Sequence, residues 1–233
     1  MAQPHEWRAP SGRRLTVTLP DKSVVESRTV LARLAGSTIT AGFQIGPTGF
    51  FEKFANYEQP TTVVDRFVLQ NREVVVAASA DGYLTVAGWR GPHHDVAVVF
   101  TGPAPQRSRL MEYFDTFTYN DDPTGVTIAI PSTVNADLFS ETIGVVVQDR
   151  GQIVIPSATA AQGLVPRHRG TPSRHGEVWR TQKNPDAKGE RVRDYMYLLG
   201  TPRGFAEITF FEHASVSDDD LLRWLDDIDV SWQ

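Results

Sequence analysis

Five basic or titratable side chains are concentrated in one short segment past the middle of the chain. The segment 167–175 holds Arg167, His168, Arg169, Arg174 and His175. Arginine binds carboxylates and phosphates through two parallel hydrogen bonds, and a dense group of cations attracts anions. The segment is therefore a candidate binding site for an anion, a nucleotide phosphate or an acidic peptide. The alternative, which we favour from the sequence, is an ordinary solvated loop.

Aromatic side chains recur at helical spacing in a second segment, which spans residues 50–57. Its members Phe50, Phe51, Phe54 and Tyr57 would line one face of a helix. Phe and Tyr bury a large area at a small cost in conformational entropy, so this face is a candidate anchor for a protein partner. The alternative is that the rings complete the core of the N-terminal half, and this is the interpretation that we favour.

The histidines offer the remaining candidates for chemistry. None of the six forms a His-x-x-x-His pair, and the adjacent His93 and His94 cannot both face one ligand from a regular element. We therefore expect no metal site. His94, His168 or His175 can still act with a carboxylate as an acid–base pair. That pair is the basis of an alternative hypothesis, an enzyme whose site lies between two halves of the chain.

Motifs for nucleophilic catalysis and phosphate transfer are missing from the sequence. No serine lies in a Gly-x-Ser-x-Gly elbow, and the glycine-rich segment 42–49 lacks the Gly-Lys-Ser/Thr of a phosphate-binding loop. We therefore assign no catalytic residue and expect no cofactor.

The composition argues against several classes of protein. The 233 residues carry a formal net charge of −5, whereas a general nucleic-acid binder usually has a strongly basic face. The chain contains no cysteine, which excludes disulfides, thiolate metal sites and cysteine nucleophiles. The N-terminal residues lack the apolar core of a signal peptide, and no apolar run reaches the roughly 18 residues of a membrane span. We therefore expect a cytoplasmic protein without a membrane span.

Two segments about half a chain apart begin with the same pattern. Residues 10–20 and 123–131 each read as a Pro-Ser/Thr-Gly turn, a short strand with alternating apolar residues, and a terminating proline. An offset of 111 residues superimposes the two strands. The shared pattern indicates that the chain contains an internal duplication.

The same offset recurs at the end of each half. It relates residues 110–117 to 221–228, and in both segments the apolar side chains at i, i+4 and i+7 predict one face of a helix. Ser217 is the predicted N-cap of the second helix, with acidic residues in the first turn where the helix dipole favours them. A shared register at both ends strengthens the case for duplication.

The fold class follows from this organisation. The segments 63–69, 73–78, 83–89 and 96–100 read as strands that are too closely spaced for anything but antiparallel pairing. The Asp81-Gly82 dipeptide predicts a hairpin between two of them. We therefore expect an α+β protein made of two tandem related halves, residues 1–119 and 120–233. Each half would be an antiparallel sheet packed against a C-terminal amphipathic helix.

The edges of each half resemble the Mog1p/PsbP-like group, which includes bacterial lipoproteins and secretion-associated chaperones. The resemblance rests on DPTGVTIAIP at 122–131 and LLRWLDDIDVSW at 221–232. Members of that group have an opening strand of this kind and a final helix that runs into a short last strand. This chain differs in holding two copies and in lacking a lipoprotein signal. The resemblance implies a binding, chaperone or assembly role, with no catalytic residue to carry over.

The leading hypothesis is a non-enzymatic, cytoplasmic protein-binding module, such as an accessory chaperone, an immunity factor or an assembly adaptor. A fused pair of halves presents two surfaces, as a groove or an exposed sheet edge, without the entropic cost of association. The alternatives are the acid–base enzyme and an anion or nucleotide binder that uses the loop 167–175. We expect a protein partner and no general binding of nucleic acid.

Overall fold

The computed structural model describes residues 2–37, 39–184, 189 and 191–233. The fold is mostly β, with 52% of the residues in strands and 15% in helices, and the expected α+β class is therefore wrong. The difference arises in segments for which the sequence predicted no helix or strand. Residues 25–36 and 136–147 form strands of 12 residues each, whereas the helices at 107–115 and 218–226 have only nine residues each.

The chain divides into two compact units that are interleaved in sequence. Unit 1 consists of residues 1–7, 13–28 and 140–233, and unit 2 consists of residues 8–12 and 29–139. The strands β3 (Val25–Gly36) and β11 (Ala136–Val147) contribute residues to both units.

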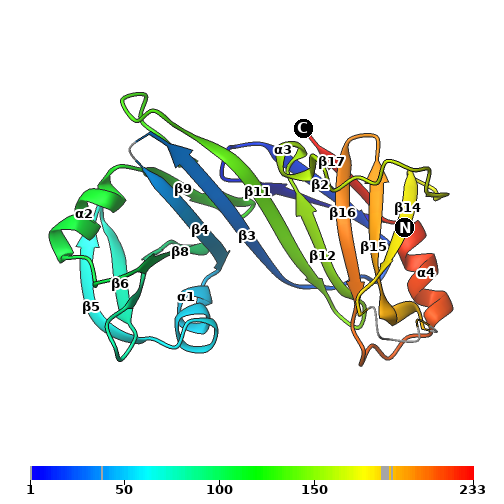
Figure 1. Cartoon of the computed structure of the whole chain (residues 1–233), viewed down its shortest axis with the longest axis horizontal. Helices are drawn as coiled ribbons and strands as arrows, with labels where there is room; N and C mark the ends of the chain where they lie inside the picture. Colours follow the sequence, from blue (N-terminus) through cyan, green and yellow to red (C-terminus); the bar gives the residue numbers. More distant parts are fainter. Residues whose placement is uncertain (1, 38, 185–188, 190) are drawn as a thin grey trace. The chain divides into compact units, whose positions relative to one another are not determined.

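Unit 2 is built on an antiparallel sheet whose neighbouring strands follow the order β5-β6-β7-β8-β4-β3 (Figure 1). The strands other than β3 are β4 (Thr40–Pro47), β5 (Thr62–Leu69), β6 (Arg72–Ala78), β7 (Leu84–Arg90) and β8 (His94–Thr101). The meander predicted over residues 63–100 is thus present, and Gly82 lies at the predicted hairpin with a φ of 70°. Only glycine adopts such a φ without strain.

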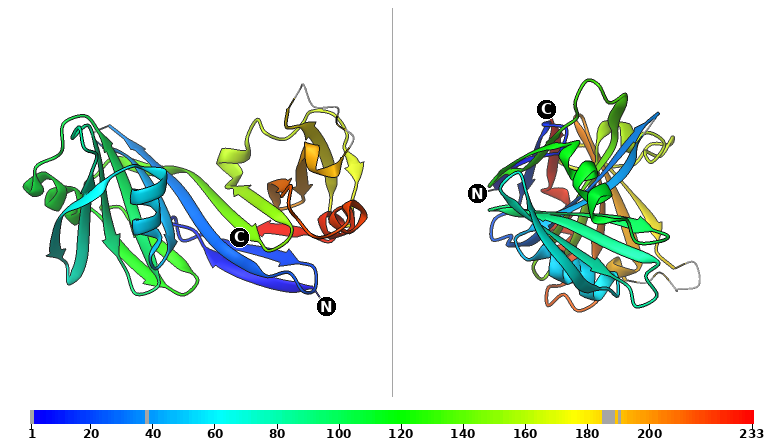
Figure 2. Two further views of the ribbon diagram at one scale, coloured as in Figure 1. Left: turned by 90° about the horizontal axis from the view of Figure 1, so that it is seen from below. Right: turned by 90° about the vertical axis from the view of Figure 1, so that its left-hand side faces the viewer.

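Short helices and a second, two-stranded sheet complete unit 2. The helix α1 (Phe50–Lys53), with its continuation as a π-helical turn (Phe54–Glu58), covers one face of the main sheet (Figure 2). The helix α2 (Arg107–Asp115) leads into β9 (Thr118–Asp122), which pairs with β10 (Gly125–Ala129). Aromatic rings contribute to the core of unit 2, where the ring centroids of Phe43 and Phe117 lie 5.4 Å apart.

Unit 1 contains a sheet with the corresponding order β13-β14-β15-β16-β12-β11. Apart from β11, its strands are β12 (Gly151–Pro156), β13 (Thr171–Pro172), β14 (Glu177–Gln182), β15 (Tyr195–Thr201) and β16 (Gly204–Phe210). Its other elements are α3 (Ala158–Ala161), a 3₁₀ turn (Val192–Asp194), α4 (Asp218–Asp226) and the strands β1 (Gln3–Arg8), β2 (Arg14–Leu19) and β17 (Asp229–Trp232). The Ser217 side chain accepts a hydrogen bond from the Asp220 N–H, which confirms the predicted cap of α4.

In each unit, a strand from the N-terminal half of the sequence pairs with a strand from the C-terminal half. In unit 1 the N-terminal strand β2, drawn in blue, pairs with the C-terminal strand β17, drawn in red (Figure 1). In unit 2 the closing strand of the N-terminal half, β9, pairs with β10, which opens the C-terminal half. The sheets of the two units thus share one strand order, and the units exchange their opening strands. The proposed division into repeats 1–119 and 120–233 remains a prediction about ancestry.

Within the described part of the chain, no helix is both long and apolar enough to cross a bilayer.

The exchange of strands predicts where a core substitution acts. Leu15 lies in β2 and Ile128 in β10, and both side chains are buried. Truncation of such a side chain to Ala typically costs about 2–5 kcal/mol. We expect Leu15→Ala to speed amide hydrogen exchange in β15 and β16, although the substituted residue is in the N-terminal half. Ile128→Ala should instead act on β7 and β8. Faster exchange in β7 and β8 for Leu15→Ala would contradict the exchanged pairing.

Candidate functional site

A cavity of about 550 Å³ lies in unit 1, where the edge of the sheet meets α4. Its lining comes from the loop before β13, from β13 to β15, and from α4: His168, Arg169, Gly170, Thr171, Pro172, Ser173, Val178, Trp179, Arg180, Tyr197, Leu222, Leu225 and Asp226. The volume falls within the range of about 300–1,000 Å³ that is typical of sites for small ligands. Apolar, aromatic and cationic groups therefore share one concave surface.

The strands β14 and β15 form the floor of this cavity. Arg180 and Tyr197 are directly opposite each other in the antiparallel register, so their side chains lie on the same face. The Tyr197 ring packs 5.4 Å from Phe210, whose own ring packs 6.2 Å from Trp224 of α4. The Tyr197 hydroxyl donates to the carbonyl of Val192 at 3.2 Å. Burial raises the pKa of Tyr197 above its ordinary value, against the opposing effect of the Arg180 charge, so this residue stays neutral.

The basic segment from the sequence analysis divides at this cavity. His168 and Arg169 belong to the lining, whereas Arg167, Arg174 and His175 do not. The Arg174 guanidinium forms an ion pair of 2.5 Å with Asp227, and its backbone N–H donates to Asp226 at 3.0 Å. Arg174 therefore anchors the loop to the end of α4.

Specific hydrogen bonds hold the loop against β14. The Trp179 indole donates to the carbonyl of His168 at 2.8 Å, and the Gly170 N–H donates to the Glu177 carboxylate at 2.9 Å. A Cβ atom on Gly170 would lie 2.8 Å from the Trp179 ring, so the close approach of this loop requires glycine. The loop backbone is thus fixed by its neighbours, and the Arg169 side chain is exposed next to the cavity.

The charges around the cavity favour an anion. In the described part of the chain no carboxylate forms an ion pair with Arg169 or Arg180, and the Arg180 guanidinium lies 4.8 Å from the centre of the Tyr195 ring. The one carboxylate of the lining, Asp226, already accepts a hydrogen bond from the Arg174 backbone. Two arginine side chains therefore remain available for a carboxylate or a phosphate group.

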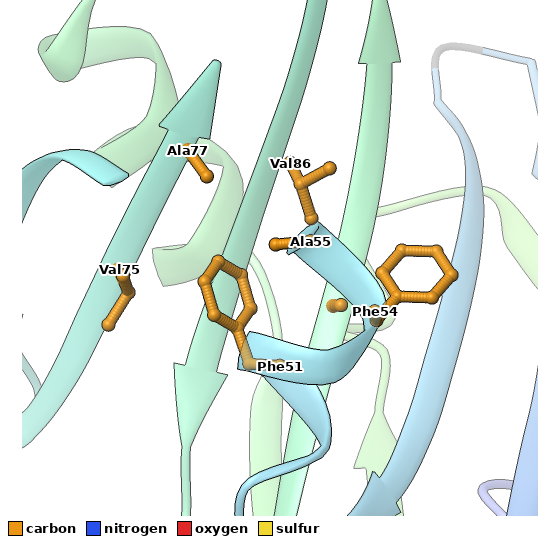
Figure 3. Packing of buried hydrophobic residues seen from close by; sticks show 7 residues of the cluster. Phe51, Phe54, Ala55, Val75, Ala77 and Val86 are labelled. Atoms are coloured by element: carbon orange, nitrogen blue, oxygen red, sulfur yellow. The ribbon is translucent and has the colours of Figure 1, made fainter. Parts of the chain in front are cut away.

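The aromatic segment 50–57 lies elsewhere, in unit 2, and most of it faces inward. Phe51 and Phe54 are buried against Val75 and Val86 of the sheet (Figure 3). Phe50 is half-buried and stacks on Phe54 with ring centroids 5.4 Å apart. Tyr57 is 86% exposed. The first three rings therefore serve the core of unit 2, and only Tyr57 is accessible to a partner.

Polar groups are also buried in unit 2. The His94 ring nitrogen Nδ1 lies 2.7 Å from Asp121, which also accepts hydrogen bonds from the backbone N–H groups of His93 and His94. Both paired side chains are almost fully buried, which keeps them from a substrate in solution. His168, by contrast, lines the cavity of unit 1 together with Asp226, but no hydrogen bond joins those two described residues.

Asp95 has a structural role at the start of α1. One carboxylate oxygen accepts from the N–H groups of Gly49 and Phe51, at 2.8 and 3.1 Å. Asp95 is 1% exposed, and it borders a smaller cavity of about 300 Å³ with Glu52 and Arg90. These hydrogen bonds satisfy backbone N–H groups at the start of the helix, which have no acceptor within the helix itself. Among the described residues, no group of three or more His, Cys, Asp or Glu side chains is arranged to hold a metal ion.

Sequence patterns identified only the loop side of the cavity. Arg180, Trp179 and Tyr197 lie in strands that read as ordinary alternating segments, and nothing marks them as neighbours of residues 168–173. The sequence offered one signal, since Leu222 lies beside the predicted apolar stripe of the last helix and is not part of it. In the structure this side chain is 40% exposed.

No protein-family model, curated protein or solved structure that was compared with the chain matches it. The resemblance to the Mog1p/PsbP-like group remains a prediction.

The burial of Asp95 predicts a specific pH dependence of stability. Burial raises the pKa of its carboxyl, although the N–H donors of Phe51 and Gly49 act to lower it. Between the ordinary pKa and the raised folded-state pKa, the folded protein keeps a proton that the unfolded chain releases, so stability falls as the pH rises. We expect the wild type to gain stability relative to Asp95→Asn as the pH falls from 7 to 4. Urea denaturation measures this difference, and parallel pH profiles would contradict the expectation.

Proposed function

We propose that the protein is a non-enzymatic binding module that holds an acidic segment of a protein partner in the unit 1 cavity. One observation carries the proposal: the basic loop lines the same cavity as Arg180, an arginine of the strand β14. Two guanidinium groups that pair with no carboxylate among the described residues, next to Trp179 and Leu222, suit a ligand that carries both negative charge and apolar surface.

The chemistry of the lining favours binding over turnover. Arginines act as fixed, permanently charged donors, and they recognise carboxylates by geometry. The acid–base alternative requires His168 to act with Asp226, whose carboxylate is already engaged by the Arg174 backbone. The nucleotide alternative shares the anionic chemistry, and phosphate-bearing ligands are the natural competitors in a binding test.

The wider role that we propose is that of an accessory chaperone, an immunity factor or an assembly adaptor in the cytoplasm. The absence of cysteine suits a reducing compartment, and the net charge of −5 disfavours general nucleic-acid binding. The resemblance to the Mog1p/PsbP-like group, as a tandem pair, points in the same direction.

Substitution of the two cavity arginines tests this function. The probe is a blocked peptide of alternating glutamate and phenylalanine, titrated by calorimetry and by tryptophan fluorescence. We expect Arg169→Ala and Arg180→Ala each to weaken binding by a factor of about 10 to 100, because a hydrogen bond to a charged group contributes about 1.5–3 kcal/mol. Added salt should weaken binding further, since exposed charges are screened.

The matched control is Arg109→Ala, which removes an exposed arginine of α2 in unit 2 and makes the same change in net charge. It should leave the affinity unchanged. A peptide of alternating lysine and phenylalanine should not bind. Equal affinity of the wild type for the acidic and basic peptides would rule out the proposed function.

A further inference from the structure

The two units differ at one edge of otherwise corresponding sheets. In unit 2 the edge strand β5 has eight residues and is paired with β6 from Leu69 to Thr62. It places Phe67, which is 7% exposed, next to α2, where the Arg107 guanidinium lies 5.0 Å from the ring centre. In unit 1 the corresponding strand β13 has only two residues. The sheet of unit 1 therefore lacks most of an edge strand.

The missing length leaves part of β14 without a neighbour. Thr171 and Pro172 of β13 pair with Val178 and Glu177 only. Within the ranges that the structure describes, no strand pairs with the outer edge of residues 179–181. An edge without a neighbouring strand can accept a further strand from another chain.

The alternation of the ladder shows which backbone groups point outward. The Lys183 N–H donates to the carbonyl of Asp194, so odd-numbered residues of β14 bond to β15. On the opposite edge of β14, the Ser173 N–H donates to the carbonyl of Gly176. Even-numbered residues therefore point to this edge, and Val178 is the one that faces Thr171 of β13. The next residue that points outward is Arg180. Its backbone N–H and carbonyl are directed to the open edge.

The chain before β13 does not cover this edge. If β13 continued backward, residue 169 would pair with Arg180. Instead the loop bonds to side chains, since the carbonyl of His168 accepts from the Trp179 indole and the Gly170 N–H donates to Glu177. The cavity of unit 1 opens between this edge and Leu222 and Leu225 of α4. In unit 2 the corresponding place between the edge strand and α2 holds Phe67.

We propose that an extended segment of the partner protein binds here as an antiparallel strand beside residues 179–181 of β14. The segment would lie in line with β13, with its C-terminal end next to Thr171. Main-chain hydrogen bonds to Arg180 would provide affinity, and alternate side chains would provide specificity. One side chain of the segment is apolar and enters the cavity, and a second one, two residues away on the same face, is acidic and contacts Arg180 or Arg169.

This inference rests on the proposed function and names the form of its ligand. The comparison with unit 2 supports it, because β5 at the equivalent edge supplies both an apolar side chain and a carboxylate. Phe67 supplies the apolar side chain, and Asp65 supplies a carboxylate, which lies 3.6 Å from Arg107.

The probe for the experiment is a blocked synthetic peptide with the sequence of residues 60–69, added to the full-length protein. Hydrogen exchange of individual amides is followed by NMR. At about 90% occupancy we expect the Arg180 amide to exchange about tenfold more slowly, because it gains a partner only in the complex. The Thr181 amide, which already bonds to β15, should not change.

Two further peptides provide the matched control. Both have the sequence of residues 60–69 with N-methyl groups on alternate residues. In the first peptide the methylated amides would face β14 in the added strand, and in the second they would face away from it. Strand addition predicts that only the first peptide fails to bind. Arg180→Ala should weaken binding but keep the protection of the amide at residue 180, since the backbone is unchanged.

The outcomes separate this inference from the proposed function. Equal binding of both N-methylated peptides, or an unchanged Arg180 amide, overturns strand addition. The function itself survives if the glutamate–phenylalanine peptide still binds in an Arg180-dependent manner. Failure of the 60–69 peptide to bind at millimolar concentration also overturns strand addition. Failure of both peptides overturns the two proposals together.

Discussion

The pairing of β2 with β17 is the constraint on which the organisation of unit 1 depends. The register sets Val17 against Val230 and Leu15 against Trp232, so the two ends of the chain share one set of backbone hydrogen bonds. The chain between them, which includes residues 29–139 of unit 2, must close into a loop before these bonds form. The corresponding pair in unit 2, β9 with β10, is local in sequence. One antiparallel pair is therefore formed by segments near the two ends of the chain, and the other is formed across a tight turn.

The exchange of strands links the two halves of the sequence. The strand β2 pairs with β17 at the other end of the chain, and β10 pairs with β9, so each unit contains strands from both halves. The sheets of the two units also share one strand order. An internal duplication remains a prediction.

Once the units are compared, their difference is more informative than their similarity. Unit 2 completes its sheet with β5 and places Phe67 against α2. Unit 1 stops at Pro172, and the space beside α4 remains as a cavity with cationic walls. The placement of polar groups follows the same division: the side chains of Asp95 and Asp121 are buried and hold the backbone of unit 2, whereas Arg169 and Arg180 of unit 1 are exposed beside the cavity.

Local sequence patterns determined the elements that depend on neighbours in the chain. They correctly predicted the meander of β5 to β8, the cap of α4 at Ser217 and the repeated opening strands, because turns, caps and alternation act over a few residues. They also placed a cluster of cations at 167–175, and the core alternative for Phe51 and Phe54 was the one the structure supports. The fold class failed, since nothing in the sequence marked residues 25–36 and 136–147 as long strands. The sequence also did not place Arg180 and Tyr197 beside the basic loop, because contacts across strands depend on their register. The register of β14 against β15 and the early end of β13 are set by backbone hydrogen bonds between strands, and only the tertiary structure fixes them.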